Sequence, residues 1–122
     1  MRKPVKVYRE QYSHLPGRFV KKIDQDLKRV LDAELPGLKK VFLFGSCARG
    51  EVRSTSDVDL LILTQHRLTE RVRASELRWD LDEAVSGVRT DVVYMNMESA
   101  EEKSVFHTVL NRDKKLILEV IE

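Results

Sequence analysis

Apolar residues recur along most of the chain at intervals that predict alternating helices and strands. Helical three- and four-residue spacing covers residues 18–34, 68–85 and 99–110. Short runs rich in branched and aromatic side chains predict strands at 39–44, 57–64, 90–95 and, as an edge strand, 116–121. This order predicts an α/β (α+β) domain in which helices pack on one small mixed β-sheet.

Residues 1–16 show neither pattern, and we predict an N-terminal arm in front of a single domain at 17–122. Val5 and Val7 allow a short strand in this arm, although Pro4 and Pro16 bracket it. The arm is basic, so it is one candidate contact for a partner.

The helix predicted at 68–85 has apolar residues on two sides. Leu77 and Leu81 share one face, whereas Trp79 lies roughly opposite, at about 100° per residue. One interpretation is a helix wedged between the sheet and a neighbouring element, or broken near Ser75, and we favour it. The other is that Trp79 marks a patch that faces a partner.

Composition narrows the class of protein. The 122 residues are 42% hydrophobic and 34% charged, which predicts one folded domain rather than a disordered chain. The 22 basic and 20 acidic residues are interspersed, giving no strong sign of direct nucleic-acid binding. No apolar run approaches the roughly 20 residues of a membrane span. The single cysteine, Cys47, excludes an internal disulfide, and a cytoplasmic location is expected.

Two carboxylates stand at the mouth of the strand predicted at 57–64. Asp57 and Asp59 are two residues apart, so on a strand they project from the same face. Their repulsion would be relieved by a divalent cation, and all-oxygen ligation suits Mg²⁺ or Mn²⁺. Asp91 lies near the start of the next predicted strand and would join them if the two strands are neighbours. Three acids match a site for two metal ions.

Gly45-Ser46 follows another buried strand and ends ten residues before this acidic pair. Glycine lets the backbone approach a phosphate closely, and amides at the start of a helical turn favour anions. The Ser46 hydroxyl and the Arg49 guanidinium could add contacts to the same phosphate. A Gly-Ser or an Asp-x-Asp alone usually marks only a turn or surface acids, but their conjunction on buried strands favours a functional site.

The stretches Phe44-Gly45-Ser46-Cys47-Ala48-Arg49-Gly50-Glu51 and Ser56-Asp57-Val58-Asp59-Leu60-Leu61 resemble the minimal nucleotidyltransferase (MNT) group of the DNA polymerase β-like nucleotidyltransferases. The resemblance implies that Gly45 and Ser46 hold a nucleoside triphosphate, and that Asp57, Asp59 and Asp91 bind two Mg²⁺ and are catalytic. It implies transfer of AMP from ATP to a tyrosine of a HEPN ribonuclease toxin, with the chain acting as antitoxin. Cys47 stands where the family often has arginine or another polar residue.

Two other functions stay open at this point. The same chemistry could modify a small molecule such as an aminoglycoside, or the chain could block a partner by occlusion without catalysis. The acceptor, the base of the nucleotide and a homo-oligomeric state are not fixed by the sequence. The short chain leaves little room for an acceptor-recognition domain, which favours a protein partner.

Overall fold

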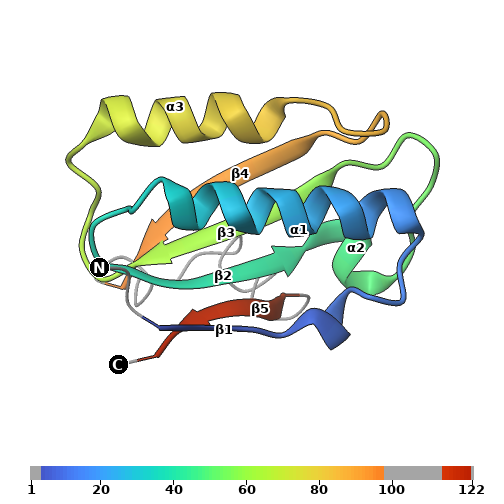
Figure 1. Ribbon diagram of the computed structural model, residues 1–122, viewed down its shortest axis with the longest axis horizontal. Coiled ribbons are helices and arrows are strands. Elements are labelled where there is room, and N and C mark those ends of the chain that lie inside the picture. The colour runs from blue at the N-terminus through green and yellow to red at the C-terminus, as the bar shows by residue number, and fades with distance from the viewer. Residues whose placement is uncertain (1–3, 98–113, 122) are drawn as a thin grey trace.

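The computed structural model describes residues 4–97 and 114–121, and the helix predicted at 99–110 lies outside them. In chain order the elements are β1 (Val5–Val7), the short 3₁₀ helix η1 (Arg9–Gln11), α1 (Gly17–Asp32), β2 (Leu38–Phe44), α2 (Gly45–Arg49), β3 (Val58–Thr64), α3 (Arg71–Asp82), β4 (Thr90–Asn96) and β5 (Lys115–Val120). The predicted mixed sheet with packed helices is confirmed (Figure 1). No helix in the described ranges is long and apolar enough to cross a membrane.

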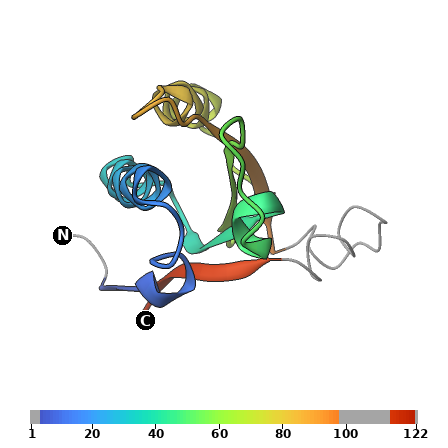
Figure 2. The same cartoon turned by 90° about the vertical axis from the view of Figure 1, so that its right-hand side faces the viewer.

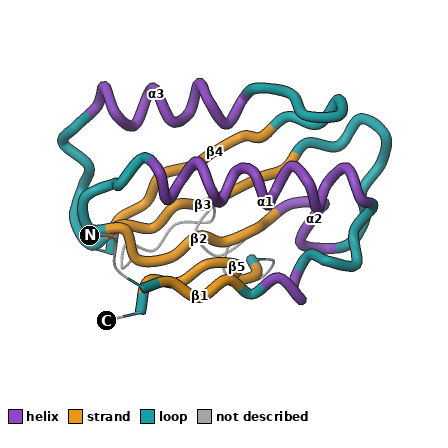
Figure 3. Tube along the Cα trace, in the orientation of Figure 1, coloured by secondary structure: helices purple, strands orange, loops and turns teal. Residues whose placement is uncertain are grey.

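The sheet has five described strands in the order β1-β5-β2-β3-β4 (Figure 3). Only β3 and β4 run parallel, while the other described pairs are antiparallel. The predicted edge position of β5 is wrong, because β5 pairs with β1 on one side and β2 on the other. The sequence offered little sign of this, since the strand that covers β5 is only three residues long.

The two faces of the sheet differ in what covers them. Helices α1 and α3 lie on the same side of the sheet (Figure 2). They enclose the main core, into which alternate strand residues project, among them Val41, Leu43, Leu60, Ile62 and Val92. The opposite face carries a smaller apolar cluster, which comprises Phe42, Phe44, Leu61, Leu63, Val93, Met95 and Leu116. Since strand side chains alternate, Asp59 and Asp91 belong to this second face.

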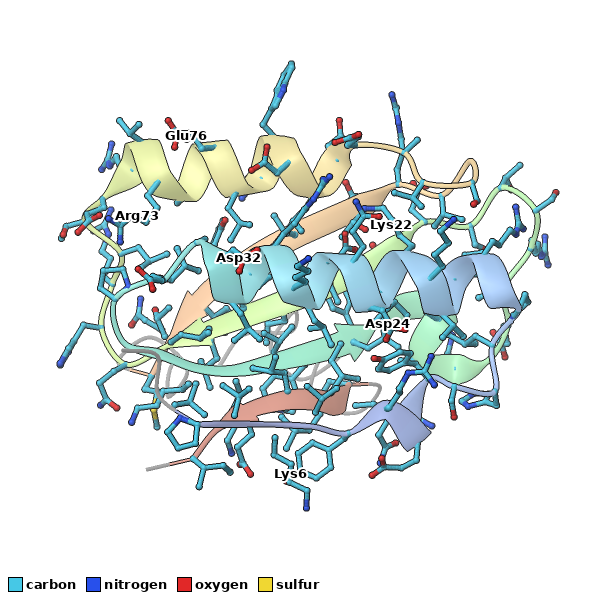
Figure 4. All side chains as sticks on the ribbon, viewed as in Figure 1. Lys6, Lys22, Asp24, Asp32, Arg73 and Glu76 are labelled. Carbon is cyan, nitrogen blue, oxygen red and sulfur yellow. The ribbon has the colours of Figure 1, made fainter. Side chains whose placement is uncertain are left out.

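The N-terminal segment is packed into the fold rather than standing apart from it. The short strand that Val5 and Val7 allow is confirmed as β1, which pairs with β5. Tyr12 is fully buried, and its hydroxyl donates a hydrogen bond of 2.5 Å to Asp24. Arg9 pairs with the same carboxylate at 3.0 Å, and Asp24 faces this segment from α1 (Figure 4). Residues 4–16 therefore contribute both an edge strand and core packing.

Helix α3 continues through Ser75 without a break, and its second apolar side is exposed to solvent. Leu77 and Leu81 are buried, but Val72 is 72% exposed and Trp79 is 80% exposed. The wedged or broken helix that we favoured is therefore wrong for the described part of the chain. The helix is also shorter than the predicted range of 68–85.

The predicted C-terminal end of that helix is a tight turn. The helix stops at Asp82, and Val85 and Val88 exchange hydrogen bonds of 2.9 and 3.0 Å across Ser86-Gly87. Both turn residues have positive φ, 53° and 79°, which is the geometry of the two-residue turn that favours glycine. This turn leads the chain directly into β4, whose second residue is Asp91.

Candidate active site

The predicted acids meet where β2, β3 and β4 lie side by side. Asp59 pairs with Phe44 of β2 on one side and with Asp91 of β4 on the other. Neighbouring strands lie about 4.8 Å apart, and paired residues of parallel strands project from the same face. The structure therefore brings together two acids that are 32 positions apart in the sequence, as the strand-neighbour hypothesis requires.

Asp57 lies one residue before β3 and is exposed. Burial, together with the negative charges of Asp91 and Asp57, raises the pKa of Asp59 to about 6, although the positive charge of Arg49 opposes the shift. The three acids thus share one electrostatic environment. A half-buried carboxylate with two acidic neighbours is costly to ionise unless a cation joins it.

Gly45 joins the two sequence motifs in space. It has φ of +70°, and a Cβ placed on it would collide with the Asp59 carboxylate, lying 3.2 Å from Cγ and closer still to one oxygen. A side chain at this position would therefore suffer both backbone strain and a steric clash. Only glycine lets α2 begin directly against the acidic end of β3.

The remaining residues of α2 support this arrangement. The Cys47 thiol is buried and lies 3.6 Å from the carbonyl oxygen of Asp57, to which it can donate a hydrogen bond. Burial raises the pKa of Cys47 to about 12, with Asp59 and Asp57 adding to the effect, so the thiol stays protonated. Ser46 is half-buried in the first turn, beside Gly45.

Arg49 ends α2 and forms an ion pair with Glu51 at 3.2 Å. Its side chain is partly exposed, and its positive charge lowers the pKa of Asp59. The guanidinium therefore lies within electrostatic range of the acids and at the open side of the site. A ligand phosphate would compete with Glu51 for it.

A buried polar cluster beneath the site was missed from the sequence. Lys22 and Asp26 on α1 are fully buried and form an ion pair of 2.6 Å, and Lys22 also donates to the Leu81 carbonyl at 2.7 Å. Thr90 donates a hydrogen bond to the other oxygen of Asp26. Figure 4 shows Lys22 on α1. Because Thr90 immediately precedes Asp91, this cluster fixes the start of β4.

A signal for that cluster existed in the helical pattern. At about 100° per residue, Lys22 and Asp26 fall inside the stripe formed by Phe19, Ile23 and Val30 rather than on the polar face. Charged residues on an apolar stripe at a four-residue spacing predict a buried pair.

The donor set fits a hard divalent cation. Carboxylate oxygens are the ligands that Mg²⁺ or Mn²⁺ prefers, and the three acids would supply them. In the described ranges, no three His, Cys, Asp or Glu side chains already stand in a metal-binding group. The case for a cation site therefore rests on the oxygen ligands that the three acids offer and on the repulsion between their charges.

A family model described as a nucleotidyltransferase domain matches residues 21–117. The chain belongs to the nucleotidyltransferase domain family. The matched residues include every acid of the site as well as Gly45 and Ser46. No curated protein matches the chain.

Solved structures show the same fold for this nucleotidyltransferase domain. One is a proposed nucleotidyltransferase from Sulfolobus solfataricus, with a TM-score of 0.54, 22% identity and coverage of 79% of this chain and 76% of that one. A toxin-antitoxin complex with AMP-PNP gives a TM-score of 0.55 and 22% identity, covering 76% and 70%. A tri-AMPylated HEPN toxin from Shewanella oneidensis with its MNT antitoxin gives 0.52 and 21%, covering 79% and 68%.

Proposed function

We propose that this chain is a Mg²⁺-dependent nucleotidyltransferase that moves AMP from ATP onto a tyrosine hydroxyl of a HEPN-type partner and thereby acts as its antitoxin. The observation that carries the proposal is the register of Asp59 against Asp91, next to a glycine that has no room for a side chain. Membership of the nucleotidyltransferase domain family supports the reaction class.

In the proposed complex Gly45 and Ser46 bind the triphosphate. The Ser46 hydroxyl and the amides at the start of α2 donate hydrogen bonds to the phosphate oxygens, while Gly45, which lacks a Cβ, lets this turn lie against the Asp59 carboxylate. Arg49 exchanges Glu51 for a phosphate oxygen. Each of these contacts orients the α-phosphorus toward the second face of the sheet.

Asp57, Asp59 and Asp91 would hold Mg²⁺. When bound, Mg²⁺ supplies positive charge that offsets the phosphate charge during transfer. The raised pKa of Asp59 reflects the cost that such a cation removes. The buried hydrogen bond from Thr90 to Asp26 keeps Asp91 in place beside Asp59.

The proposed transfer is a displacement at the α-phosphorus. The acceptor oxygen forms a bond to this phosphorus as the bond to the β-phosphate oxygen breaks, and pyrophosphate leaves. The acceptor proton passes to the Asp91 carboxylate, which is exposed at the site, and then to water. Positioning and charge neutralisation supply most of the rate.

Two structures of similar fold support the choice of acceptor. One holds AMP-PNP in a toxin-antitoxin complex, and the other contains a tri-AMPylated HEPN toxin with an MNT antitoxin. The free, buried thiol of Cys47 is compatible with the cytoplasmic location that we propose for such a system.

The test incubates the chain with α-labelled ATP, Mg²⁺ and the helical protein encoded by the neighbouring reading frame. We expect label on that protein, at a tyrosine, and loss of its ribonuclease activity. An Asp57→Asn/Asp59→Asn variant should transfer at least about a hundredfold less, since it loses two ligands of the cation.

The matched control is Glu10→Gln/Glu76→Gln, which also removes two acidic charges but at exposed positions away from the site. It should transfer as the wild type does. The proposal is wrong if the aspartate variant neutralises the partner as well as the wild type and no label moves in either. That result would favour inhibition by occlusion.

A further inference from the structure

A groove runs along α3 on its side toward β4 and ends at Asp91. It consists of two hollows, of about 360 and 260 Å³, that share Ser75 and Arg78. The first is lined by Arg67, Arg71, Tyr94 and Asn96 among others, and the second by Trp79, Asp82, Thr90 and Asp91. One end of the groove is therefore remote from the acids and the other end includes one of them.

The remote end carries an unusual concentration of positive charge. Arg67, Arg71 and Arg78 all line it and are exposed. Within residues 4–97 and 114–121, none of the three has a carboxylate partner, and Arg78 lies 5.5 Å from the centre of the Tyr94 ring. The remaining arginine of α3 behaves differently, since Arg73 pairs with Glu70 at 3.1 Å.

The near end combines an open aromatic ring with negative charge. Trp79 is 80% exposed and lines the same hollow as Asp82 and Asp91. A large exposed indole in a hollow is a common anchor for a protein partner. Trp79 and Asp91 both line this hollow at β4, the edge strand of the described sheet, and the Asp91 carboxylate projects from the other face, so an acceptor held by Trp79 reaches that acid around this edge.

We propose that this groove, defined by Arg67, Arg71, Arg78, Trp79 and Asp91, binds an acidic segment of the acceptor protein and presents that segment's tyrosine to Asp91. The inference rests on the proposed function, which requires an acceptor surface. The arginines bind the segment's carboxylates, and the Trp79 ring packs against its tyrosine.

The distribution of charge favours a protein segment over a nucleic acid. A nucleic-acid strand carries negative charge along its whole length, and Asp82 and Asp91 would repel it at the near end. A peptide can be acidic where it meets Arg67 and Arg71 and uncharged where it meets the aspartates. The groove matches such a peptide, because arginines line one end and aspartates line the other.

The length of the groove sets the spacing within the segment. Eight helical residues separate Arg71 from Trp79, which is about 12 Å at 1.5 Å per residue. An extended peptide covers that distance in about four residues. The acidic residues should therefore lie about four positions from the modified tyrosine.

The test uses a fluorescent peptide with a central tyrosine and glutamates about four residues away on both sides. We expect fluorescence anisotropy to show binding by the wild-type chain without nucleotide. Arg67→Glu/Arg71→Glu should weaken the affinity at least about tenfold, because both pairs become repulsive. Lys21→Glu/Lys28→Glu makes the same charge change on exposed positions of α1 and should bind normally.

A second peptide with lysine in place of glutamate should not bind. The inference is overturned if both peptides bind alike, if the two charge-reversal variants behave alike, or if a single-stranded RNA binds the arginine groove and the acidic peptide does not. Binding is measured without ATP, so its failure is separate from failure of AMP transfer. Peptide binding with no transfer to any acceptor would retain the groove and reject the proposed function.

Discussion

Gly45 is the residue at which the proposed phosphate-binding motif contacts the acidic motif. Its φ of +70° and its contact with the Asp59 carboxylate leave no room for a side chain. The two motifs can lie in contact only because Gly45 has no Cβ. They therefore lie in contact although ten residues separate them in the sequence.

Gly45→Ala tests this fit. We expect the free energy of unfolding to fall by about 1–3 kcal/mol, because alanine is strained at positive φ and displaces Asp59. Binding of a triphosphate should fall as well. Urea unfolding and a thermal shift with nucleotide measure the two effects. Gly17→Ala is the matched control, since a Cβ there meets no atom within 4 Å, and it should lower neither property.

Asp59→Asn should make the free protein more stable at neutral pH. The pKa of Asp59 is about 6 when folded, above its usual value of 3.8, so the folded state loses stability as pH rises through this range. The amide removes that cost, and we expect a gain of about 1 kcal/mol at pH 8, allowing for partial exposure.

The gain should disappear below about pH 4, where the wild-type carboxyl is protonated in both the folded and the unfolded state. Unfolding in urea at a series of pH values measures this difference without metal or nucleotide. A wild type that is more stable than the variant at pH 8 would contradict the proposed charge repulsion among the three acids.

Among the elements, the buried ion pair of α1 supports β4, the strand that carries Asp91. Lys22 and Asp26 link α1 to the Leu81 carbonyl of α3 and to Thr90 of β4. These contacts therefore connect α1, α3 and β4 at the residue where β4 begins. Burial raises the pKa of Asp26 even though Lys22 and Thr90 oppose the shift.

Asp26→Leu should lower the free energy of unfolding by about 3–5 kcal/mol, because it leaves the Lys22 ammonium buried without a counter-charge. Lys22→Met/Asp26→Leu should recover most of that loss, since no charge then remains. Urea unfolding compares the variants with the wild type. If the double variant is as unstable as the single variant, the loss does not come from an unpaired Lys22 charge, and the prediction is wrong.

Much of the fold and of the candidate site could be predicted from the sequence, because the local pattern of apolar and acidic residues decides which strands form and which side chains share a face. The strands around Asp59 and Asp91 are continuous apolar runs, and a two-residue spacing decides which face an acid occupies. The limits also have physical causes. The pairing of β5 with β1 joins residues that are far apart in the sequence, and a strand of only three residues leaves too short a pattern to predict it. The exposure of Trp79 depends on what packs against α3, which periodicity alone does not reveal.

At the scale of the whole molecule, the strand order assembles the site from distant parts of the chain. Strands β2, β3 and β4 deliver Gly45, Asp59 and Asp91 to one end of the sheet. Helices α1 and α3 lie on the opposite face (Figure 2) and therefore, within the described residues, leave these acids accessible to the nucleotide that we propose. The groove beside α3 would then provide the approach for the acceptor.

The proposed metal–triphosphate site is tested most directly by a thermal shift measurement with Mg²⁺ and a nonhydrolysable ATP analogue. If Gly45, Ser46 and the three acids form one metal–triphosphate site, the wild type should gain about 2.7 kcal/mol at a ligand concentration of about 100 times Kd. Its Tm should rise only when both ligands are present, and Asp57→Asn/Asp59→Asn should not respond. An equal rise in that variant, or no rise in the wild type at saturation, would contradict the account.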